Sequence, residues 1–520
     1  MNLQIKRTVL AVLCISPMSI LATTFYIDPN FRASSLAKID AAKYGKVKNM
    51  PLPNIFPALK SVQPGDSVLL AGGVHSYTQS INITVNGTPD KPIIFASYPG
   101  DTAVLDFSAA PLDKAAAVTV TASALAFNNV IYENASQHGC IVSGSNSVYT
   151  QCIFRNNGNK GCQVLGGHNQ FINCDAYGNG KTDAADGDGF APQLEDLGGN
   201  KFVGCRSWNN GDDGWDGYLK DDSKNITDTL VNCWSVSNGY DMQGNSTASA
   251  GGNGNGFKPG SATGYHNWVE INCLAAYNQQ KGFDQNHSLA TIIIINCTSF
   301  NNYKWNFCDY EAPASGHTYT IKNCITLRTS AITPLSPLID TLCSQVVQSN
   351  NSWLSGFGPA AATDFASVDT TGLKGARKSD GSLPDVKCLH LASGSKMVDA
   401  GVLVPGISGT LAPYQGKAPD LGCFESSYTA SPVNSGSIAS AYPWKISYDA
   451  NSLKVRFPSS GYADIAVYTV GGQKIVNIAH RTIVAGDAIN VMDFDRESAG
   501  TYICSIKYNG ALSTKTIVKN

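Results

Sequence analysis

Short runs of alternating hydrophobic and polar residues recur through most of the chain, and the same pair of residues closes each run. Between positions 150 and 302, a cysteine is followed five positions later by an asparagine in six pairs: Cys152/Asn157, Cys174/Asn179, Cys205/Asn210, Cys233/Asn238, Cys273/Asn278 and Cys297/Asn302. Successive cysteines lie 22 to 40 residues apart, a spacing that is too irregular for a helical array and suits coils with loop insertions. Asparagine tolerates the left-handed backbone that a sharp corner requires. The pattern predicts a right-handed parallel β-helix, and a β-sandwich with coincidental pairs is the weaker interpretation.

A second unit of four residues, with glycine in second place, follows each corner. Its copies are His138–Ile141, Lys160–Gln163, Asp188–Ala191, Asp213–Asp216, Asn255–Lys258 and Lys281–Asp284. The third residue is always cysteine or aromatic, as an inward stack requires, so the fourth residue should point outward. Because equivalent positions on neighbouring coils lie about 4.8 Å apart, we expect Asp188 beside Asp213, and Asp216 beside Lys258. The long step from 213 to 255 indicates a loop at 244–254 that bulges from the coil.

The two ends of the chain carry different patterns. An apolar run at Phe25–Ile27 predicts an opening strand, and residues 54–62 predict an amphipathic helix with Asn54 as its N-cap. Such a helix would plug the open end of the β-helix and protect its edge. Near the C-terminus, period-two strands around Gly471-Gly472 predict a hairpin in a small β-sandwich. The fold class is therefore all-β, in four parts: a secretory signal at 1–22, the β-helix at 23–425, a linker rich in Ser, Ala and Pro at 426–442, and the β-sandwich at 443–520.

Composition and charge exclude several classes of protein. The 520 residues are 43% hydrophobic, which excludes wholesale disorder, and a net charge of −2 offers no basic surplus for nucleic acid. The N-terminal signal has a basic start at Lys6 and Arg7, an apolar run at Val9–Leu21 and the small residue Ala22. The apolar run is too short for a membrane anchor. We expect a secreted protein without membrane contact after signal removal, and nothing argues against a monomer.

Cysteine is frequent for an exported chain. Cys14 lies in the signal segment, so 14 of the 15 cysteines remain after its removal. An exported protein could pair them. Their regular placement, with Cys324 after Asn323 as a seventh copy of the repeat, indicates a packing role instead.

Four carboxylates converge in the second register: Asp188 on one coil, with Asp212, Asp213 and Asp216 on the next. Several carboxylates on one face suit Ca²⁺, which takes oxygen ligands at about 2.3–2.6 Å. Without a cation, four such charges would repel strongly. The alternative is that these aspartates are turn residues, as aspartate before glycine often is. That alternative does not explain Asp212 or the outward Asp216, so we favour a Ca²⁺ site.

Lys258 is the candidate general base, because its column places it one coil beyond Asp216 and outside the core. The alternative is a solvated lysine paired with Asp216, which geometry alone does not exclude. Chemistry favours the base: Ca²⁺ beside a uronic acid carboxylate acidifies the C5 proton, and a neutral amine can remove it. A lysine pKa of about 10.4 requires alkaline conditions, and the neighbouring aspartates would raise that pKa further.

The central block resembles polysaccharide lyase family 9, the pectate lyases with a parallel β-helix. The resemblance rests on Asp188-Gly189-Phe190 and on the segments 208–216 and 253–258, and it covers about residues 25–425. It implies that the four aspartates hold Ca²⁺ and that Lys258 abstracts the proton. Polygalacturonate would be cleaved by β-elimination, leaving a 4,5-unsaturated uronate end. Members of the family also include lyases of rhamnogalacturonan I, which is the alternative substrate.

Two other functions compete with the lyase. A β-helical polygalacturonase would hydrolyse with paired carboxylates such as Asp212 and Asp213. It should also carry His-Gly downstream and an Arg-Ile-Lys segment, but His138-Gly139 lies upstream and that segment does not occur. A Ca²⁺-stabilised β-helix that only binds glycans survives as a rival, because fold does not imply function. Lys258 discriminates, since a structural Ca²⁺ site has no need of it.

The sequence identifies the residues that would contact a polyanionic glycan less clearly than it identifies the metal site. The candidates are Lys220, Lys281 and Arg206 for uronate carboxylates, and Trp208 and Tyr218 for sugar faces. Each is as well explained as a surface or corner residue. The segments Tyr468–Gln473 and Gly500–Tyr502 are similar to sorting domains of the type IX secretion route, which implies secretion machinery as a partner. A carbohydrate-binding or linker role is the alternative for this C-terminal part.

Overall fold

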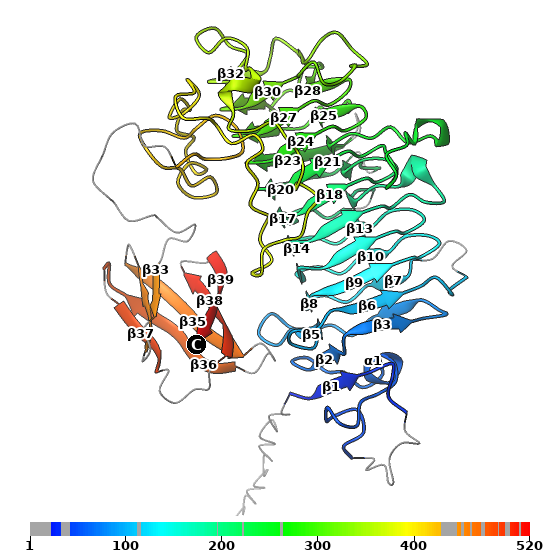
Figure 1. Ribbon diagram of the computed structural model, residues 1–520. Coiled ribbons are helices and arrows are strands. Elements are labelled where there is room, and N and C mark those ends of the chain that lie inside the picture. The colour runs from blue at the N-terminus through cyan, green and yellow to red at the C-terminus, as the bar shows by residue number, and fades with distance from the viewer. Residues whose placement is uncertain are drawn as a thin grey trace, which may run out of the picture.

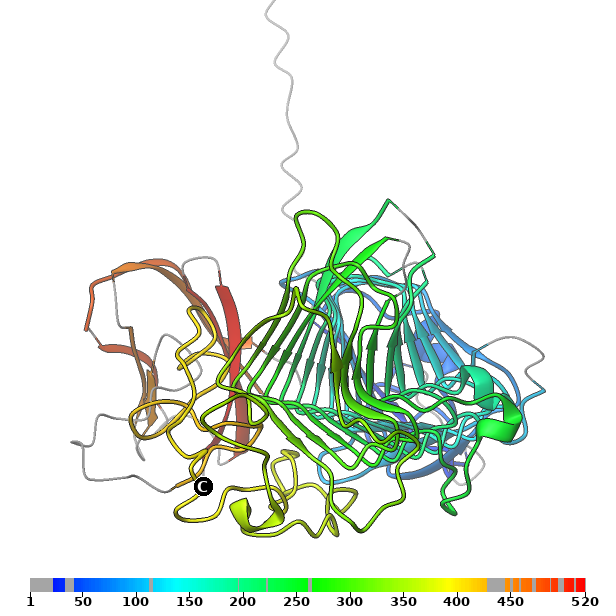
Figure 2. The same ribbon diagram turned by 90° about the horizontal axis from the view of Figure 1, so that it is seen from above.

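Three parallel sheets form the main body of the computed structural model (Figures 1 and 2). The described residues are 22–32, 42–111, 116–194, 196–220, 223–260, 264–427, 445–448, 452–457, 460–469, 474–486, 488–493, 500–508 and 511–519. Each coil adds one short strand to each sheet, so the predicted parallel β-helix is confirmed. The predicted signal at 1–22 falls almost wholly outside the described residues. Among the described residues, no helix is long and apolar enough to cross a membrane.

The sheets are named A, B and C in the order in which a coil visits them. Sheet A contains β1 (Thr24–Ile27), β2 (Ser67–Leu70), β5 (Ile93–Ser97), β8 (Leu125–Asn128), β11 (Val148–Thr150), β14 (Gln170–Ile172), β17 (Lys201–Val203), β20 (Asn225–Val231), β23 (Tyr265–Ile271), β26 (Ile292–Ile295), β29 (Tyr319–Lys322) and β32 (Val347–Ser349). Sheet B contains β3 (Gly73–Ser76), β6 (Ala103–Asp106), β9 (Val130–Glu133), β12 (Ile153–Arg155), β15 (Asp175–Tyr177), β18 (Arg206–Trp208), β21 (Trp234–Val236), β24 (Leu274–Ala276), β27 (Thr298–Phe300) and β30 (Ile325–Leu327). Sheet C contains β4 (Ile81–Ile83), β7 (Val118–Val120), β10 (Cys140–Val142), β13 (Cys162–Val164), β16 (Phe190–Pro192), β19 (Trp215–Gly217), β22 (Phe257–Pro259), β25 (Lys281–Asp284), β28 (Trp305–Asp309) and β31 (Thr341–Leu342).

Like residues stack on one another inside the β-helix. Sheet A carries an aromatic stack with ring centroids 4.6–5.1 Å apart: Phe95, Phe127, Tyr149, Phe171 and Phe202. Sheet C carries a second stack at 5.0–5.1 Å: Phe190, Trp215, Phe257, Phe283 and Phe307. These spacings follow the strand separation of about 4.8 Å, so each ring fixes the register of the next coil.

The cysteines of the repeat form a third column. They are fully buried: Cys152, Cys174, Cys205, Cys233, Cys273, Cys297 and Cys324. The backbone N–H of Cys174 donates to Cys205 Sγ at 3.4 Å. The described cysteines of this column are unpaired. Full burial in the hydrophobic core agrees with the predicted packing role.

The asparagines of the repeat form a hydrogen-bonded ladder at the corner after sheet B. In each step the backbone N–H of one asparagine donates to Oδ1 of the asparagine on the next coil, at 3.0–3.3 Å. The ladder runs through Asn157, Asn179, Asn210, Asn238, Asn278 and Asn302. It satisfies buried corner amides that have no partner in a sheet.

Replacement of Asn210 by alanine should lower the free energy of unfolding by about 2–4 kcal/mol, because each buried group left without a partner costs about 1–3 kcal/mol. Asn210 is fully buried, and its side chain binds both Asn179 and Asn238. Urea unfolding followed by circular dichroism measures the effect. Asn245→Ala, at an exposed loop position, is the control. Equal midpoints for the two variants would show that the ladder does not stabilise the fold.

A short helix lies at the N-terminal end of the β-helix, beside β1 (Figure 1). The helix predicted at 54–62 is reduced to one turn, α1 (Phe56–Leu59). Asn54 accepts the first helical N–H at 3.1 Å, but Ile55 occupies the N-cap position. Ile55 and Ala58 are buried against the end of the core. The predicted position is therefore right, whereas the predicted length and N-cap are wrong.

Beyond β32 the chain leaves the repeat and runs back along sheet B as an irregular segment, here called the strap (residues 350–427), whose one short helix is η4 (Ala362–Asp364). Gln151 donates to the carbonyl of Asp380 in the strap, and Asn323 donates to that of Val402. The apolar residues that join the strap to sheet B include Trp234, Leu274, Leu373, Leu391, Met397 and Leu421. The strap thus covers a sheet face that would otherwise be an exposed apolar surface.

Two antiparallel sheets make up the C-terminal part, as predicted. One contains β33 (Lys445–Tyr448), β34 (Ser452–Arg456) and β37 (Ala488–Asp493); the other contains β35 (Gly461–Thr469), β36 (Lys474–Ile483), β38 (Gly500–Tyr508) and β39 (Ala511–Lys519). Their shared core includes Leu453, Val455, Ile465, Val467, Ile489 and Ile506. Gly471-Gly472 lies outside the described residues, as does most of the linker, but the flanking strands β35 and β36 pair antiparallel.

Candidate active site

The outer face of sheet C carries the candidate site. Its strands β16, β19 and β22 are neighbours, and the register pairs Asp216 with Lys258. Fully buried Trp215 and Phe257 stack inside the β-helix, so the next residue of each strand points outward. The predicted neighbour relation of Asp216 and Lys258 is confirmed.

Three aspartates form a buried cluster, here called the acidic cluster. One carboxylate oxygen from each of Asp188, Asp213 and Asp216 lies within 4.8 Å of the other two. The backbone N–H of Asp213 donates to Asp188 Oδ1 at 3.2 Å, which confirms that these two residues are stacked neighbours. Their exposed fractions are 0%, 0% and 6%. Three carboxylates so close and so dry need compensating positive charge or bound protons.

Asp212 lies beside the acidic cluster but is turned toward the inserted loop. Its Oδ1 accepts the backbone N–H of Asn253 at 2.7 Å and that of Gly254 at 3.3 Å. This loop carries η3 (Ala248–Ala250) and bulges from the coil, as the long step in the repeat predicts (Figure 2). Burial and the neighbouring Asp213 and Asp188 raise the pKa of Asp212 to about 9. The described structure thus groups three of the four predicted ligands, with the fourth within electrostatic reach.

Lys258 extends over the acidic cluster. Its Nζ lies 2.6 Å from Asp213 Oδ2 and 3.5 Å from Asp216 Oδ2, and its side chain is 12% exposed. Burial alone disfavours the ammonium, but Asp213 and Asp216 outweigh burial and hold the pKa of Lys258 well above its usual range. The lysine is therefore an ion-paired cation when the carboxylates carry no other cation. Its closer ion-pair partner is Asp213, at 2.6 Å, and not Asp216, at 3.5 Å.

A second lysine, which the sequence analysis does not single out, closes the other side of the cluster. Lys160 is 1% exposed, with Nζ 3.5 Å from Asp188 Oδ2 and in an ion pair with Asp186 of η2 (Ala184–Asp186). The amide of Gln193, oriented to donate to Asp216, also accepts from Lys160. The signal was present in the repeat: Cys162 pairs with Phe190, so Lys160 and Asp188 share one column.

The donor set fits a hard divalent cation. Asp188 Oδ2 is buried and accepts no hydrogen bond from the described residues. Burial, followed among the raising causes by Asp216 and Asp213, raises the pKa of Asp188 to about 8, although Lys160 opposes the shift. Oxygen-only ligands of this charge are those that Ca²⁺ prefers. With Ca²⁺ bound, the carboxylates would stay ionised; without a cation, burial favours the protonated form of Asp188.

Calcium affinity should rise with pH. The cation-free protein holds protons on Asp188 and Asp212 because their pKa values lie near 8 and 9 instead of 3.8. Because these pKa values are raised in the folded state, the cation-free protein loses folding stability as pH rises toward about 9. Over the same range Ca²⁺ displaces fewer protons when it binds. We expect affinity to increase at least about tenfold between about pH 6.5 and pH 8.5, measured by isothermal titration calorimetry. A flat profile would contradict the shifted pKa values.

Three of the predicted substrate contacts lie on the same side of the β-helix as the acidic cluster. Tyr218 is 38% exposed and its N–H donates to Asp216 Oδ1 at 3.1 Å. Lys220 is exposed two residues further on. Lys281 stands on β25, one coil beyond Lys258, where its Nζ lies 2.9 Å from both oxygens of Asp284. The side chains of Tyr218 and Lys220 are exposed, and their role as substrate contacts stays a prediction, whereas the charge of Lys281 is already matched by Asp284.

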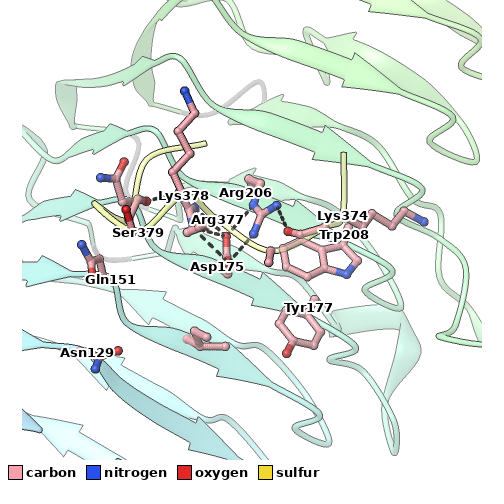
Figure 3. A pocket seen from close by; sticks show the side chains of 15 residues that line it. Asn129, Gln151, Asp175, Tyr177, Arg206, Trp208, Lys374, Arg377, Lys378 and Ser379 are labelled. Carbon is pink, nitrogen blue, oxygen red and sulfur yellow. Dashed lines mark hydrogen bonds and ion pairs between the residues drawn. The ribbon is translucent and has the colours of Figure 1, made fainter. Parts of the chain in front are cut away.

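The other two predicted contacts, Arg206 and Trp208, lie on sheet B among residues that line a pocket (Figure 3). The acidic cluster lies on sheet C. Arg206 donates to both oxygens of Asp175 at 2.8 and 3.0 Å and to carbonyls of the strap. Arg377 of the strap binds the same carboxylate. Trp208 is 7% exposed and stacks on Tyr177 with centroids 4.2 Å apart. Arg206 thus binds the strap, and Trp208 packs in the apolar cluster that joins the strap to sheet B. Their role as substrate contacts stays a prediction.

Fold and site together define a parallel β-helix protein with a carboxylate and lysine centre on one sheet. Residues 36–323 match the family described as the Pel9A-like, right-handed β-helix region. The chain belongs to this family, and the match confirms the predicted handedness.

Several relatives are similar over most of their length. A pectate lyase L of Dickeya dadantii is 33% identical over 437 residues, covering 81% of this chain and 95% of the relative. A pectate lyase L of Paenibacillus polymyxa is 29% identical over 361 residues, covering 66% and 78%. The solved pectate lyase Pel9A matches with a TM-score of 0.67 and 31% identity, over 77% of this chain and 96% of that one. A solved rhamnogalacturonan lyase matches with a TM-score of 0.59 and 23% identity over 72% and 97%, which shows the shared fold alone.

Proposed function

We propose that this protein is a calcium-dependent pectate lyase that cleaves polygalacturonate by β-elimination. Its family and the pectate lyases that match most of the chain make it a polysaccharide lyase. One observation carries the proposal: Lys258 Nζ lies 2.6 Å from Asp213, over a buried group of three carboxylates. Neither a hydrolase with two carboxylates nor a structural cation site needs a lysine there.

The chain's own residues can perform the elimination. Ca²⁺, when held by Asp188, Asp213 and Asp216 with Asp212 beside them, would draw electrons from the uronate carboxylate and so acidify the C5 proton. Lys258, as a neutral amine, takes the proton from C5. The electron pair left on C5 forms the C4–C5 double bond as the bond from C4 to the glycosidic oxygen breaks. The leaving oxygen takes a proton from solvent, and the new end is a 4,5-unsaturated uronate.

The protonation state of Lys258 links the base to the metal. The carboxylates that hold the pKa of Lys258 high would share their charge with a bound cation. The ammonium is then stabilised less and loses its proton more readily. Activity should therefore need both Ca²⁺ and alkaline pH.

Rhamnogalacturonan I is the second candidate substrate, because a solved rhamnogalacturonan lyase has the same fold. Polygalacturonate is favoured by the higher identity to pectate lyases, 33% against 23%. Polygalacturonate contains only uronate residues, whereas rhamnogalacturonan I alternates the uronate with rhamnose, so the choice depends on contacts around Tyr218 and the inserted loop.

Near-ultraviolet absorbance tests the reaction, because the unsaturated product absorbs there and the substrate does not. We expect absorbance to rise when polygalacturonate is incubated with the protein at alkaline pH with Ca²⁺, and to stay flat with a chelator. The same assay with rhamnogalacturonan I is the matched comparison. New reducing ends without absorbance would indicate hydrolysis, and no change with either polymer would favour a glycan-binding protein.

We also infer that the protein is secreted and acts as a monomer. The support for secretion is the basic and apolar pattern of residues 1–22 and the similarity of the C-terminal segment to type IX sorting domains. Fractionation of the producing cells tests it: lyase activity should appear outside the cell or at its surface. Activity retained in the cytoplasm would contradict the inference.

A further inference from the structure

A second buried cluster lies behind the strand that carries Asp216. One ligand atom from each of Asp196, Asp228 and His266 lies within 4.8 Å of the other two. The residues come from three successive coils: the connection from β16 to β17, then β20, then β23. All three are at most 1% exposed. This cluster is outside the family's acidic site on sheet C and includes a histidine.

The hydrogen bonds of His266 leave a lone pair facing the two carboxylates. His266 Nδ1 lies 2.7 Å from the carbonyl oxygen of Gly217, which can only accept, so Nδ1 carries the hydrogen. In a neutral imidazole, Nε2 then has a lone pair, and burial lowers the pKa of His266, which favours that neutral form. Nε2 faces Asp228 Oδ2 at 3.3 Å and Asp196 Oδ2 at 3.7 Å. Asp196 Oδ2 is buried and has no hydrogen-bond donor among the described residues.

Each member of the cluster is also held from behind. Asp228 Oδ1 accepts the backbone N–H of Asn200 at 2.8 Å. Asp196 Oδ1 accepts from the N–H of Gly198 and from Asn200 Nδ2, both at 2.8 Å. Metal-binding histidines donate their other N–H to a carbonyl or carboxylate, and metal-binding carboxylates accept such bonds. The outer atoms are thus fixed, and the inner atoms, His266 Nε2 and one oxygen of each carboxylate, face one another.

We propose that Asp196, Asp228 and His266 bind a divalent transition-metal cation of the zinc class. Imidazole nitrogen and carboxylate oxygen bind Zn²⁺ at about 2.0–2.2 Å, so tetrahedral ligands lie about 3.3–3.6 Å apart. The atoms facing His266 Nε2 lie at 3.3 and 3.7 Å. Ca²⁺ takes six or more oxygen ligands, and the imidazole argues against it. A water molecule or the second oxygen of a carboxylate fills the fourth position.

The bound cation would link three coils and fix the strand that carries Asp216. His266 binds the carbonyl of Gly217, the residue after Asp216. The metal therefore supports the acidic cluster from behind without contacting substrate. This proposal stands independently of the lyase activity.

Metal analysis of the full-length protein tests the proposal, with Co²⁺ as the probe. Protein produced in minimal medium with Co²⁺ is dialysed against chelator-free buffer with excess Ca²⁺, which occupies the acidic cluster, and analysed by mass spectrometry of its metals. We expect about one cobalt per chain, with visible bands of a nitrogen and oxygen site. The thiolate-to-metal band should be absent, since it would report binding to the buried cysteines.

Two histidine-to-glutamine variants distinguish cobalt bound at this site from cobalt bound elsewhere on the protein. His266→Gln should lose at least about nine-tenths of the cobalt, whereas His287→Gln, at a side chain 58% exposed, should keep it. Asp228→Asn, which retains an acceptor for Asn200, is the second variant at the site, and circular dichroism verifies the fold of both variants. Equal cobalt in His266→Gln and the unaltered protein would overturn the proposal. So would an unaltered protein without cobalt, since the cluster would then be held by protons alone.

Discussion

Replacement of Lys258 by alanine is expected to lower the rate of β-elimination by about 10²–10⁴-fold, the usual contribution of a general base. The base is lost, but the carboxylates of Asp188, Asp213 and Asp216 stay in place. Calcium binding should therefore persist, and it should tighten, because the ammonium that competes for Asp213 is gone. Initial rates by absorbance and calcium titration of the same preparation measure the two effects.

The control for this variant is Lys201→Ala, which removes an exposed lysine on sheet A. Its rate should equal that of the unaltered protein. A Lys258→Ala protein that retains its rate would exclude Lys258 as the base. One that loses both its rate and its calcium would show that Lys258 instead supports the metal site.

Replacement of Asp188 by asparagine is expected to weaken calcium binding at least about 100-fold, with a matching loss of activity at low Ca²⁺. Above about pH 8, where Asp188 would otherwise lose its proton, it should also raise the melting temperature of the protein in chelator. Both effects have one cause: Asp188 is fully buried beside two other carboxylates, and asparagine keeps an acceptor for Asp213 without the charge. Calorimetric titration and thermal unfolding with and without Ca²⁺ measure the pair.

Asp369→Asn is the matched control, since Asp369 is an exposed carboxylate in the strap. It should change neither calcium affinity nor melting temperature. If Asp188→Asn instead destabilises the chelated protein, the carboxylate is satisfied without a cation and the acidic cluster is a hydrogen-bonded turn. That result would revive the interpretation of these aspartates as turn residues.

The sequence predicts the acidic cluster because, in a β-helix, alignment of the repeat shows which residues of successive coils are neighbours. Each coil presents the same positions to the same sheet, so Asp216 and Lys258 become neighbours across 42 residues once the repeat is aligned. The aromatic residue before each of them fixes the inward face. The same alignment could also have revealed Lys160, which shares a column with Asp188.

The rest depends on packing that has no period. The strap carries no repeat, so nothing in its sequence shows that Arg377 binds the same carboxylate as Arg206, that of Asp175. The carboxylate of Asp212 binds backbone amides of the inserted loop, and the repeat does not predict where an insertion places those amides. His266 stands at a buried position of β23, two residues before the core residue Trp268, and a periodic pattern treats such a residue as core.

The strap has a consequence for how the β-helix folds and opens. A stack of coils can fray from either end, because each coil contacts only its neighbours. Here Gln151 binds Asp380 across 229 residues, and Asn323 binds Val402, so early and late coils share one covering segment. During synthesis, sheet B stays uncovered until that segment emerges, which is when partly folded chains aggregate most readily. We expect the coils that the strap covers to open as one cooperative unit.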